Sequence, residues 1–118
     1  MGTFKWPLRI SSMDGRQSQD IEAVVGTGAF YTTLPVGLLR SLGIEPRGKR
    51  RVPQAGGRGI DLDYGQAWVS INGKSEITQV VFGEDESLAL LGTYTLDGLA
   101  LEVDPIEQRL VPKTLILY

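Results

Sequence analysis

The chain of 118 residues contains neither cysteine nor histidine. Without cysteine it forms no disulfide and carries no thiolate nucleophile. Without histidine it lacks the side chain whose pKa lies nearest neutral pH. These absences exclude Ser-His and Cys-His catalytic systems and zinc sites built from thiolates or imidazoles. Carboxylates remain as the main acid–base groups, and we expect neither a metal nor a cofactor.

Strong charge and long apolar runs are also missing. The formal net charge is −2, with both signs scattered along the chain, so no overall field attracts nucleic acid or anionic lipid. No apolar run approaches the roughly 20 residues needed to cross a bilayer. Residues 1–6 lack the apolar segment of a signal peptide. We therefore expect a cytoplasmic protein with no nucleic-acid or membrane partner.

Glycine and proline, by contrast, are frequent and evenly spread. The 15 glycines and 6 prolines separate short apolar runs, a pattern typical of many short strands joined by turns. The length suits a single domain over residues 1–118. We predict a mostly β fold with strands at Phe4–Ile10, Ile21–Val25, Phe30–Leu34, Arg51–Gln54, Ile60–Tyr64, Ala67–Ile71, Glu76–Phe82, Leu101–Val103 and Arg109–Val111.

Turns and two short helices complete the predicted secondary structure. Asn72-Gly73 is a strong hairpin signal because both residues tolerate positive φ. A first helix is expected to begin at Pro35 and to end at Gly43, and a second to cover Thr93–Leu99. The apolar run at residues 88–91 is expected to be buried. The glycine-dense residues 55–59 predict the tip of a long, mobile hairpin.

The segment VVGTGAFYTTLP, residues 24–35, resembles the active-site region of retropepsin-like aspartic proteases. In that family the turn reads Asp-Thr-Gly-Ala or Asp-Ser-Gly-Ala after apolar strand residues. Leu90-Leu91-Gly92 before the second helix resembles a further family mark. The order of hairpin, turn, helix, glycine-rich flap and Asn-Gly hairpin also fits. The resemblance implies a bacterial, single-domain member of the pepsin clan, folded as a small closed β-barrel with one or two short helices.

The resemblance also implies how such a protein works. Two chains form a homodimer, and each contributes one aspartate to a dyad that hydrolyses peptide bonds in a peptide or protein substrate. Here Gly26 occupies the position of that aspartate, followed by Thr27, Gly28 and Ala29 as the rest of the catalytic turn. The family's threonine places its hydroxyl on the facing turn of the partner. Substrate binding would fall to the flap residues Ala55, Gly56, Gly57, Arg58 and Gly59.

The resemblance predicts that the chain is an aspartic endopeptidase by family. Gly26 predicts that this form is inactive. Removal of members of a catalytic unit commonly costs about 10⁴ to 10⁶ in rate. Glycine at this position is either engineered or natural. A non-catalytic peptide-binding or assembly module on the same fold is the alternative function, and an unrelated monomeric β-barrel is a third. A nucleotide loop is excluded, because no third spaced glycine and no Lys-Ser or Lys-Thr follows.

Other charged groups have simpler interpretations. Asp61 and Asp63 share one strand face and could approach a metal, but alternating acids usually form a solvated face. The acidic run at residues 84–86 fits a loop, and Asp97 fits the second helix. The basic cluster at residues 47–51 fits a solvated loop, with binding of phosphate or an acidic peptide as the alternative.

Aromatic and terminal residues complete the predictions. Trp6, Tyr64, Trp68 and Phe82 fall in predicted strands and are expected to be buried or half-buried. The apolar closing run at residues 114–118 is expected either to pair between subunits or to form an edge strand of its own sheet.

Overall fold

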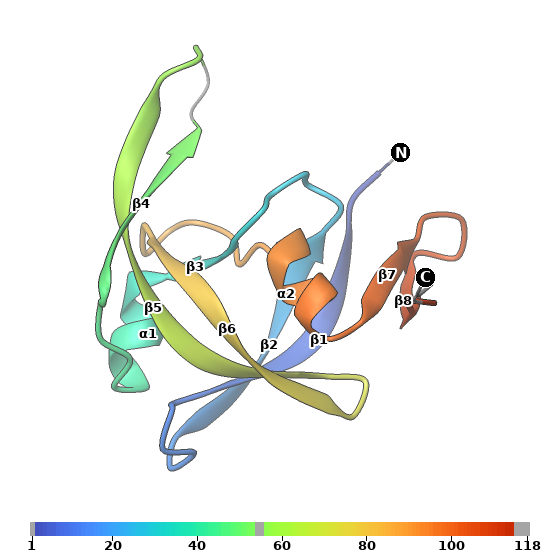
Figure 1. Ribbon diagram of the computed structural model, residues 1–118, viewed down its shortest axis with the longest axis horizontal. Coiled ribbons are helices and arrows are strands. Elements are labelled where there is room, and N and C mark those ends of the chain that lie inside the picture. The colour runs from blue at the N-terminus through green and yellow to red at the C-terminus, as the bar shows by residue number, and fades with distance from the viewer. Residues whose placement is uncertain (1, 54–55, 115–118) are drawn as a thin grey trace, which may run out of the picture.

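The computed structural model describes residues 2–53 and 56–114, which form mainly β-strands (Figure 1). The mostly β fold with two short helices is confirmed. The closing residues 115–118 lie outside the described residues, as do Gln54 and Ala55. The elements in chain order are β1 (Phe4–Ser11), β2 (Ser18–Val25), β3 (Thr32–Pro35), α1 (Val36–Ser41), β4 (Gly48–Pro53), β5 (Gly59–Ile71), β6 (Lys74–Gly83), α2 (Thr93–Gly98), β7 (Leu101–Asp104) and β8 (Arg109–Pro112).

One curved sheet forms the body, with strand order β2-β1-β5-β6-β3, and β4 pairs with β5 beyond this path. The β3–β6 pair is parallel, and β7 and β8 form a separate hairpin. The predicted closed barrel is in fact an open sheet. Its end strands β2 and β3 are joined through Leu90, which bridges Val24 on one side and Thr33 on the other. The turn between β2 and β3 keeps these two strands apart, and the segment around Leu90 lies between them.

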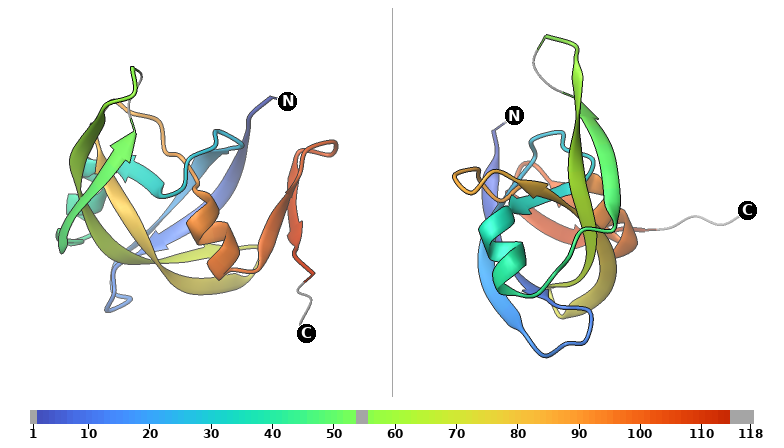
Figure 2. Two further views of the ribbon diagram at one scale, coloured as in Figure 1. Left: turned by 45° about the horizontal axis from the view of Figure 1, so that its top comes forward. Right: turned by 90° about the vertical axis from the view of Figure 1, so that its left-hand side faces the viewer.

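Strand β5 is the longest element and links the body to a projecting hairpin. Two strands were predicted here, separated near Gly65, but residues 59–71 form one strand of 13 residues. Gly65 does not break it. A Cβ built at Gly65 would lie 2.8 Å from the carbonyl oxygen of Glu45, so the glycine allows the preceding loop to cross close to the strand. The β4–β5 hairpin, called the flap hairpin below, stands clear of the body (Figure 2).

The Asn-Gly turn and the turn at Gly43 form where the sequence predicted them. Asn72 and Gly73 have φ values of 53° and 78°, as the Asn-Gly turn requires, and Gly43 ends the α1 region with φ of 72°. The backbone N–H of Gly37 in α1 donates to the carboxylate of Asp85, which explains one member of the acidic run. Within the described residues, no helix is long and apolar enough to span a membrane.

The core lies between the sheet and the two helices. Its buried members include Leu8, Ile10, Val25, Leu34, Leu39, Val69, Ile71, Val80, Leu91, Leu96 and Leu101. Phe82 is buried and Trp6, Tyr64 and Trp68 are half-buried, as predicted. The run at residues 88–91 is divided, since Leu91 is buried but the Leu88 side chain is 63% exposed.

A buried hydroxyl network joins three elements beneath the turn that follows β2. The Oγ1 atom of Thr95 in α2 lies 2.6 Å from that of Thr32 in β3 and 2.8 Å from that of Thr78 in β6. Thr32 also accepts a hydrogen bond from the backbone N–H of Gly92. Buried hydroxyl groups are costly unless they are bonded, so this network fixes α2 against the sheet.

Candidate functional site

The candidate site begins at the glycine turn, residues 26–29, which follows β2. Gly26 and Gly28 have φ values of 88° and 82°, a region that favours glycine. The backbone N–H of Ala29 donates to Oγ1 of Thr27 at 3.2 Å. Residues 26–28 are exposed, so the turn presents its backbone at the surface.

Backbone hydrogen bonds from the Leu-Leu-Gly segment and the preceding Ala89 fix the chain on both sides of this turn. The N–H of Val24 donates to the carbonyl of Ala89 at 2.8 Å, and the N–H of Leu91 donates back to Val24 at 2.9 Å. Thr33 and Leu90 exchange two backbone hydrogen bonds of 2.9 and 2.8 Å. Both ends of the turn are therefore pinned to one strip of chain about sixty residues downstream.

Gly92 makes the closest approach in this arrangement. A Cβ built there would lie 2.3 Å from the carbonyl oxygen of Phe30 and 2.3 Å from the carbonyl carbon of Tyr31. The next residues of α2 continue the contact, because Thr93 and Tyr94 donate backbone hydrogen bonds to Ala29 and Phe30. These bonds explain why β3 begins at Thr32 rather than at the predicted Phe30. The two sequence motifs are thus in direct contact.

A groove of about 560 Å³ separates the glycine turn from the flap hairpin. No acidic residue lines it within the part of the chain that the structure describes. The turn side supplies Thr27, Gly28, Ala29, Phe30, Tyr31, Thr33 and Leu90, and the flap side supplies Arg51, Val52, Pro53 and Leu62.

Most of these lining residues were missed by sequence reasoning. Of the predicted site residues, Thr27, Gly28 and Ala29 line the groove, and Gly26 lies beside it in the same turn. The predicted flap residues Gly56, Gly57, Arg58 and Gly59 follow Pro53 toward the hairpin tip and start of β5, while Ala55 lies outside the described residues. The strand residues of the flap line the groove instead. Alternation of Val52, Ile60 and Leu62 with charged neighbours was the signal available for them.

Charged side chains along the flap hairpin pair with one another, including the groove-lining Arg51. Lys49 lies opposite Asp63 and Arg51 opposite Asp61, with N–O distances of 2.9 and 3.4 Å. The interpretation of these acids as a solvated face is therefore confirmed. No group of three or more potential metal-ligating side chains occurs in the described ranges 2–53 and 56–114.

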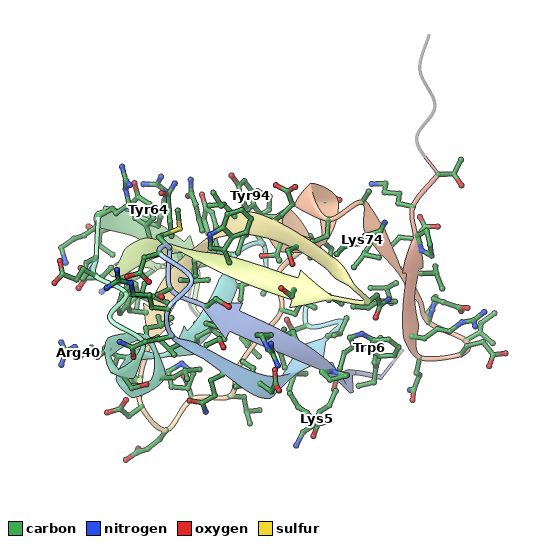
Figure 3. The ribbon with its side chains drawn as sticks, turned by 90° about the horizontal axis from the view of Figure 1, so that it is seen from below. Lys5, Trp6, Arg40, Tyr64, Lys74 and Tyr94 are labelled. Carbon is green, nitrogen blue, oxygen red and sulfur yellow. The ribbon has the colours of Figure 1, made fainter. Side chains whose placement is uncertain are left out.

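Arg50 places a permanent positive charge near the groove. Its guanidinium carbon lies 3.7 Å from the centroid of the Tyr64 ring, a cation–π contact. Burial lowers the pKa of Arg50, while interactions with the side chains of Tyr64 and Tyr31 raise it, and the net shift is upward. Figure 3 shows Tyr64 and Tyr94 along one side of the molecule, away from Lys5. Among the described residues that line the groove itself, Phe30 and Tyr31 are aromatic and Arg51 is the charged one.

Comparison with known proteins identifies the fold. No protein-family model and no curated protein sequence matches the chain. Among solved structures 160 chains match, including the retroviral EIAV protease in complex with an inhibitor. That structure shares 15% sequence identity, covers 98% of this chain and 94% of its own, and has a TM-score of 0.62. The bacterial origin and the replacement of an aspartate at position 26 stay predictions. The chain has the fold of a retropepsin.

Proposed function

We propose that this chain binds an extended peptide in the groove between the glycine turn and the flap hairpin, without cleaving it. The observation that carries this proposal is a groove between the glycine turn and the flap hairpin of a retropepsin-like fold, with no carboxylate among its described lining residues. Aspartic proteases need two carboxylates that share a proton, one acting as base toward water and the other as acid. Glycine at position 26 supplies neither function.

The lining suits a peptide in extended conformation. Phe30, Tyr31, Val52 and Leu62 offer apolar and aromatic surface from both sides of the groove, and its volume falls in the range of ligand sites. An extended peptide would add backbone hydrogen bonds by lying along the exposed turn and the flap strands. Alternate side chains of the peptide would then face the two walls.

Two copies of the chain would complete the groove as a homodimer. The exposed residues 26–28 supply a self-complementary contact across a twofold axis. The Thr27 hydroxyl accepts a hydrogen bond from Ala29, which leaves its own proton free to donate to the facing turn. Removal of two crowded carboxylates also removes repulsion at that axis.

Peptidase activity is the second candidate function, and position 26 is the observation that favours it. A side chain there has space, since a built Cβ lies 3.6 Å from the nearest atom, the carbonyl oxygen of Gly2. The Gly26→Asp variant would restore the dyad of the family. If the chain descends from a peptidase, this variant should show acid-optimum, pepstatin-sensitive cleavage of fluorogenic peptides or of itself. Silence in both proteins would favour a module that never cleaves.

Binding is tested by titrating ¹⁵N-labelled protein with a pool of randomised ten-residue peptides. Saturable shifts of the Thr27, Gly28 and Leu62 amide signals are expected. The Leu62→Arg variant places a bulky charge on the groove side of the flap and should abolish the shifts. Asp63→Arg, one residue further on the opposite face, is the matched control and should keep them. Absence of shifts in the wild-type protein would refute peptide binding.

A further inference from the structure

A second hollow lies beyond Phe30, between α2 and the part of β6 that β3 does not cover. It has a volume of about 460 Å³, and Phe30 lines both this hollow and the groove. We call it the α2 hollow and define it by Phe30, Glu76, Ile77, Tyr94, Asp97 and Gly98. Asp97 thus lies in the second helix, as expected, but also borders a concave surface.

The α2 hollow combines exposed apolar surface with acidic side chains. Phe30, Ile77 and Tyr94 are 54%, 43% and 38% exposed, and the Phe30 and Tyr94 ring centroids are 5.7 Å apart. Glu76 and Asp97 line the same hollow, and among the described residues no lysine or arginine lines it. Its character is opposite to that of the groove, where Arg51 is the only charged lining residue described.

These features point to one occupant. Resting on the proposed peptide-binding function, we propose that the α2 hollow binds a lysine or arginine side chain of the same extended peptide that fills the groove. The aliphatic stem of such a side chain packs on apolar surface while its charged head stays near acids and water. Aromatic faces such as those of Phe30 and Tyr94 also attract cations. Phe30 provides the continuity between the two binding surfaces.

Asp97 already pairs with one cation of the chain. Lys113 approaches Asp97, with an N–O distance of 3.4 Å, although Lys113 does not line the hollow. Both side chains are substantially exposed, at 40% and 64%, so this ion pair is weak and Asp97 can accept a second cation. Glu76 belongs to none of the ion pairs found in residues 2–53 and 56–114.

The first experiment tests binding to the α2 hollow with a probe too small to fill the groove as well. Acetyl-arginine amide is titrated into ¹⁵N-labelled protein, with acetyl-norleucine amide as an uncharged probe of similar stem length. Saturable shifts of the Thr78 and Gly98 amide signals are expected for the arginine probe, with binding about fivefold or more tighter than for norleucine. Equal binding of the two probes, or no saturation with either, would overturn the proposal.

Substitutions assign the interaction to its residues. Glu76→Gln should weaken arginine binding about two- to fivefold, whereas Glu86→Gln on the loop after β6 is the matched control and should leave it unchanged. Phe30→Ala should also weaken binding by about two- to fivefold. Lys113→Ala should act in the opposite direction, strengthening binding about twofold because it removes the competing charge from Asp97. All four side chains are exposed, so the fold should survive. An unchanged affinity in Glu76→Gln would refute charge recognition.

A second experiment tests the link to the groove. The probe is an acetylated eight-residue peptide of alternating valine and threonine in which one end residue is arginine or its neutral analogue citrulline. For the peptide with arginine at one of its two ends, the amide signals of Gly28 and Gly98 should shift with the same titration midpoint. That midpoint should lie at a several-fold lower peptide concentration than for the citrulline peptide. Shifts at Gly28 without Gly98 would refute this proposal and leave peptide binding intact. Arginine-amide shifts at Gly98 with Gly28 silent toward the peptide would instead refute the groove function and the link.

Discussion

At the scale of single residues, glycines serve two separable purposes in this site. Gly26 and Gly28 provide backbone conformations with positive φ, whereas Gly92 provides space. Only the first purpose can be suspected from a Gly-x-Gly turn in the sequence. The second depends on which segment crosses Gly92, and the sequence indicated this only through a family resemblance.

Gly92→Ala should therefore be strongly destabilising. The new Cβ would overlap the backbone of Phe30 and Tyr31, which cannot move without breaking the bonds that hold the turn. We expect a loss of about 2–3 kcal/mol in the free energy of unfolding, measured with urea. Gly98→Ala is the matched control, since a Cβ there meets nothing within 4 Å, and its unfolding free energy should change by less than about 1 kcal/mol. Equal losses of unfolding free energy in Gly92→Ala and Gly98→Ala would contradict the close packing of Gly92 against Phe30 and Tyr31.

Position 26 should resist substitution for a different reason. The φ of 88° suits glycine, although the space around a built Cβ is ordinary. Gly26→Asn should lower the free energy of unfolding by about 1–2 kcal/mol through backbone strain alone. Urea denaturation checks this value. A neutral result would mean that the turn relaxes to a conformation that ordinary residues adopt.

At the scale of elements, β5 joins two regions that differ in their strand pairing. Residues 59–63 pair only with β4 in the flap hairpin, whereas residues 64–71 pair with β6 and, in part, with β1. The sequence predicted the flap hairpin from its glycine-rich tip but divided β5 at Gly65. Close approach of the Glu45 carbonyl, a tertiary contact, explains why this glycine lies inside a strand.

Hydrogen exchange should reveal this division. Amide protons of residues 59–63 should exchange at least roughly a hundredfold faster than those of residues 66–71, because few buried contacts hold the flap hairpin. Exchange followed by NMR at neutral pH measures both halves of the same strand. Uniform protection along β5 would contradict an independently opening flap hairpin and would favour a rigid groove wall.

The β7–β8 hairpin should carry an acid-sensitive contact. Backbone N–H groups of Glu107 and Ile106, together with the Arg109 side chain, hydrogen bond to Asp104 and hold its pKa below the ordinary value of 3.8. A carboxylate with a lowered folded-state pKa stabilises the fold above its unfolded pKa, and the stabilisation is lost as pH falls through the folded value. Stability should therefore decrease below about pH 4.

Asp104→Asn should flatten this acid dependence. Its urea midpoint should change less than that of the wild-type protein between pH 5 and pH 2, since the titrating carboxylate is gone. Arg109→Gln is the matched variant. It should keep most of the dependence, because the Glu107 backbone hydrogen bond is the larger cause of the shift. If the urea midpoint of Asp104→Asn changes with pH as much as that of the wild-type protein, other groups cause the acid sensitivity.

At the scale of the whole molecule, the proposed dimer brings two glycine turns together. Sedimentation equilibrium should show a concentration-dependent dimer, whereas a strict monomer would count heavily against a shared groove. Gly26→Asp should weaken the dimer more than the isosteric Gly26→Asn at neutral pH, because two carboxylates then face each other. The difference should disappear at acid pH. Equal dimer affinities of the Gly26→Asp and Gly26→Asn variants at neutral pH would mean that the two turns do not face each other in the dimer.

The sequence by itself determined the mostly β class, the Asn-Gly and flap hairpins, both short helices and the likeness to a retropepsin. These features follow from local backbone preferences at Asn72, Gly73 and Gly43 and from short motifs. Only the tertiary structure decided that the end strands meet through Leu90, that flap strands line the groove and that Phe30 joins it to the α2 hollow. Such contacts join segments that lie far apart in the sequence, and no local preference encodes which segments will meet.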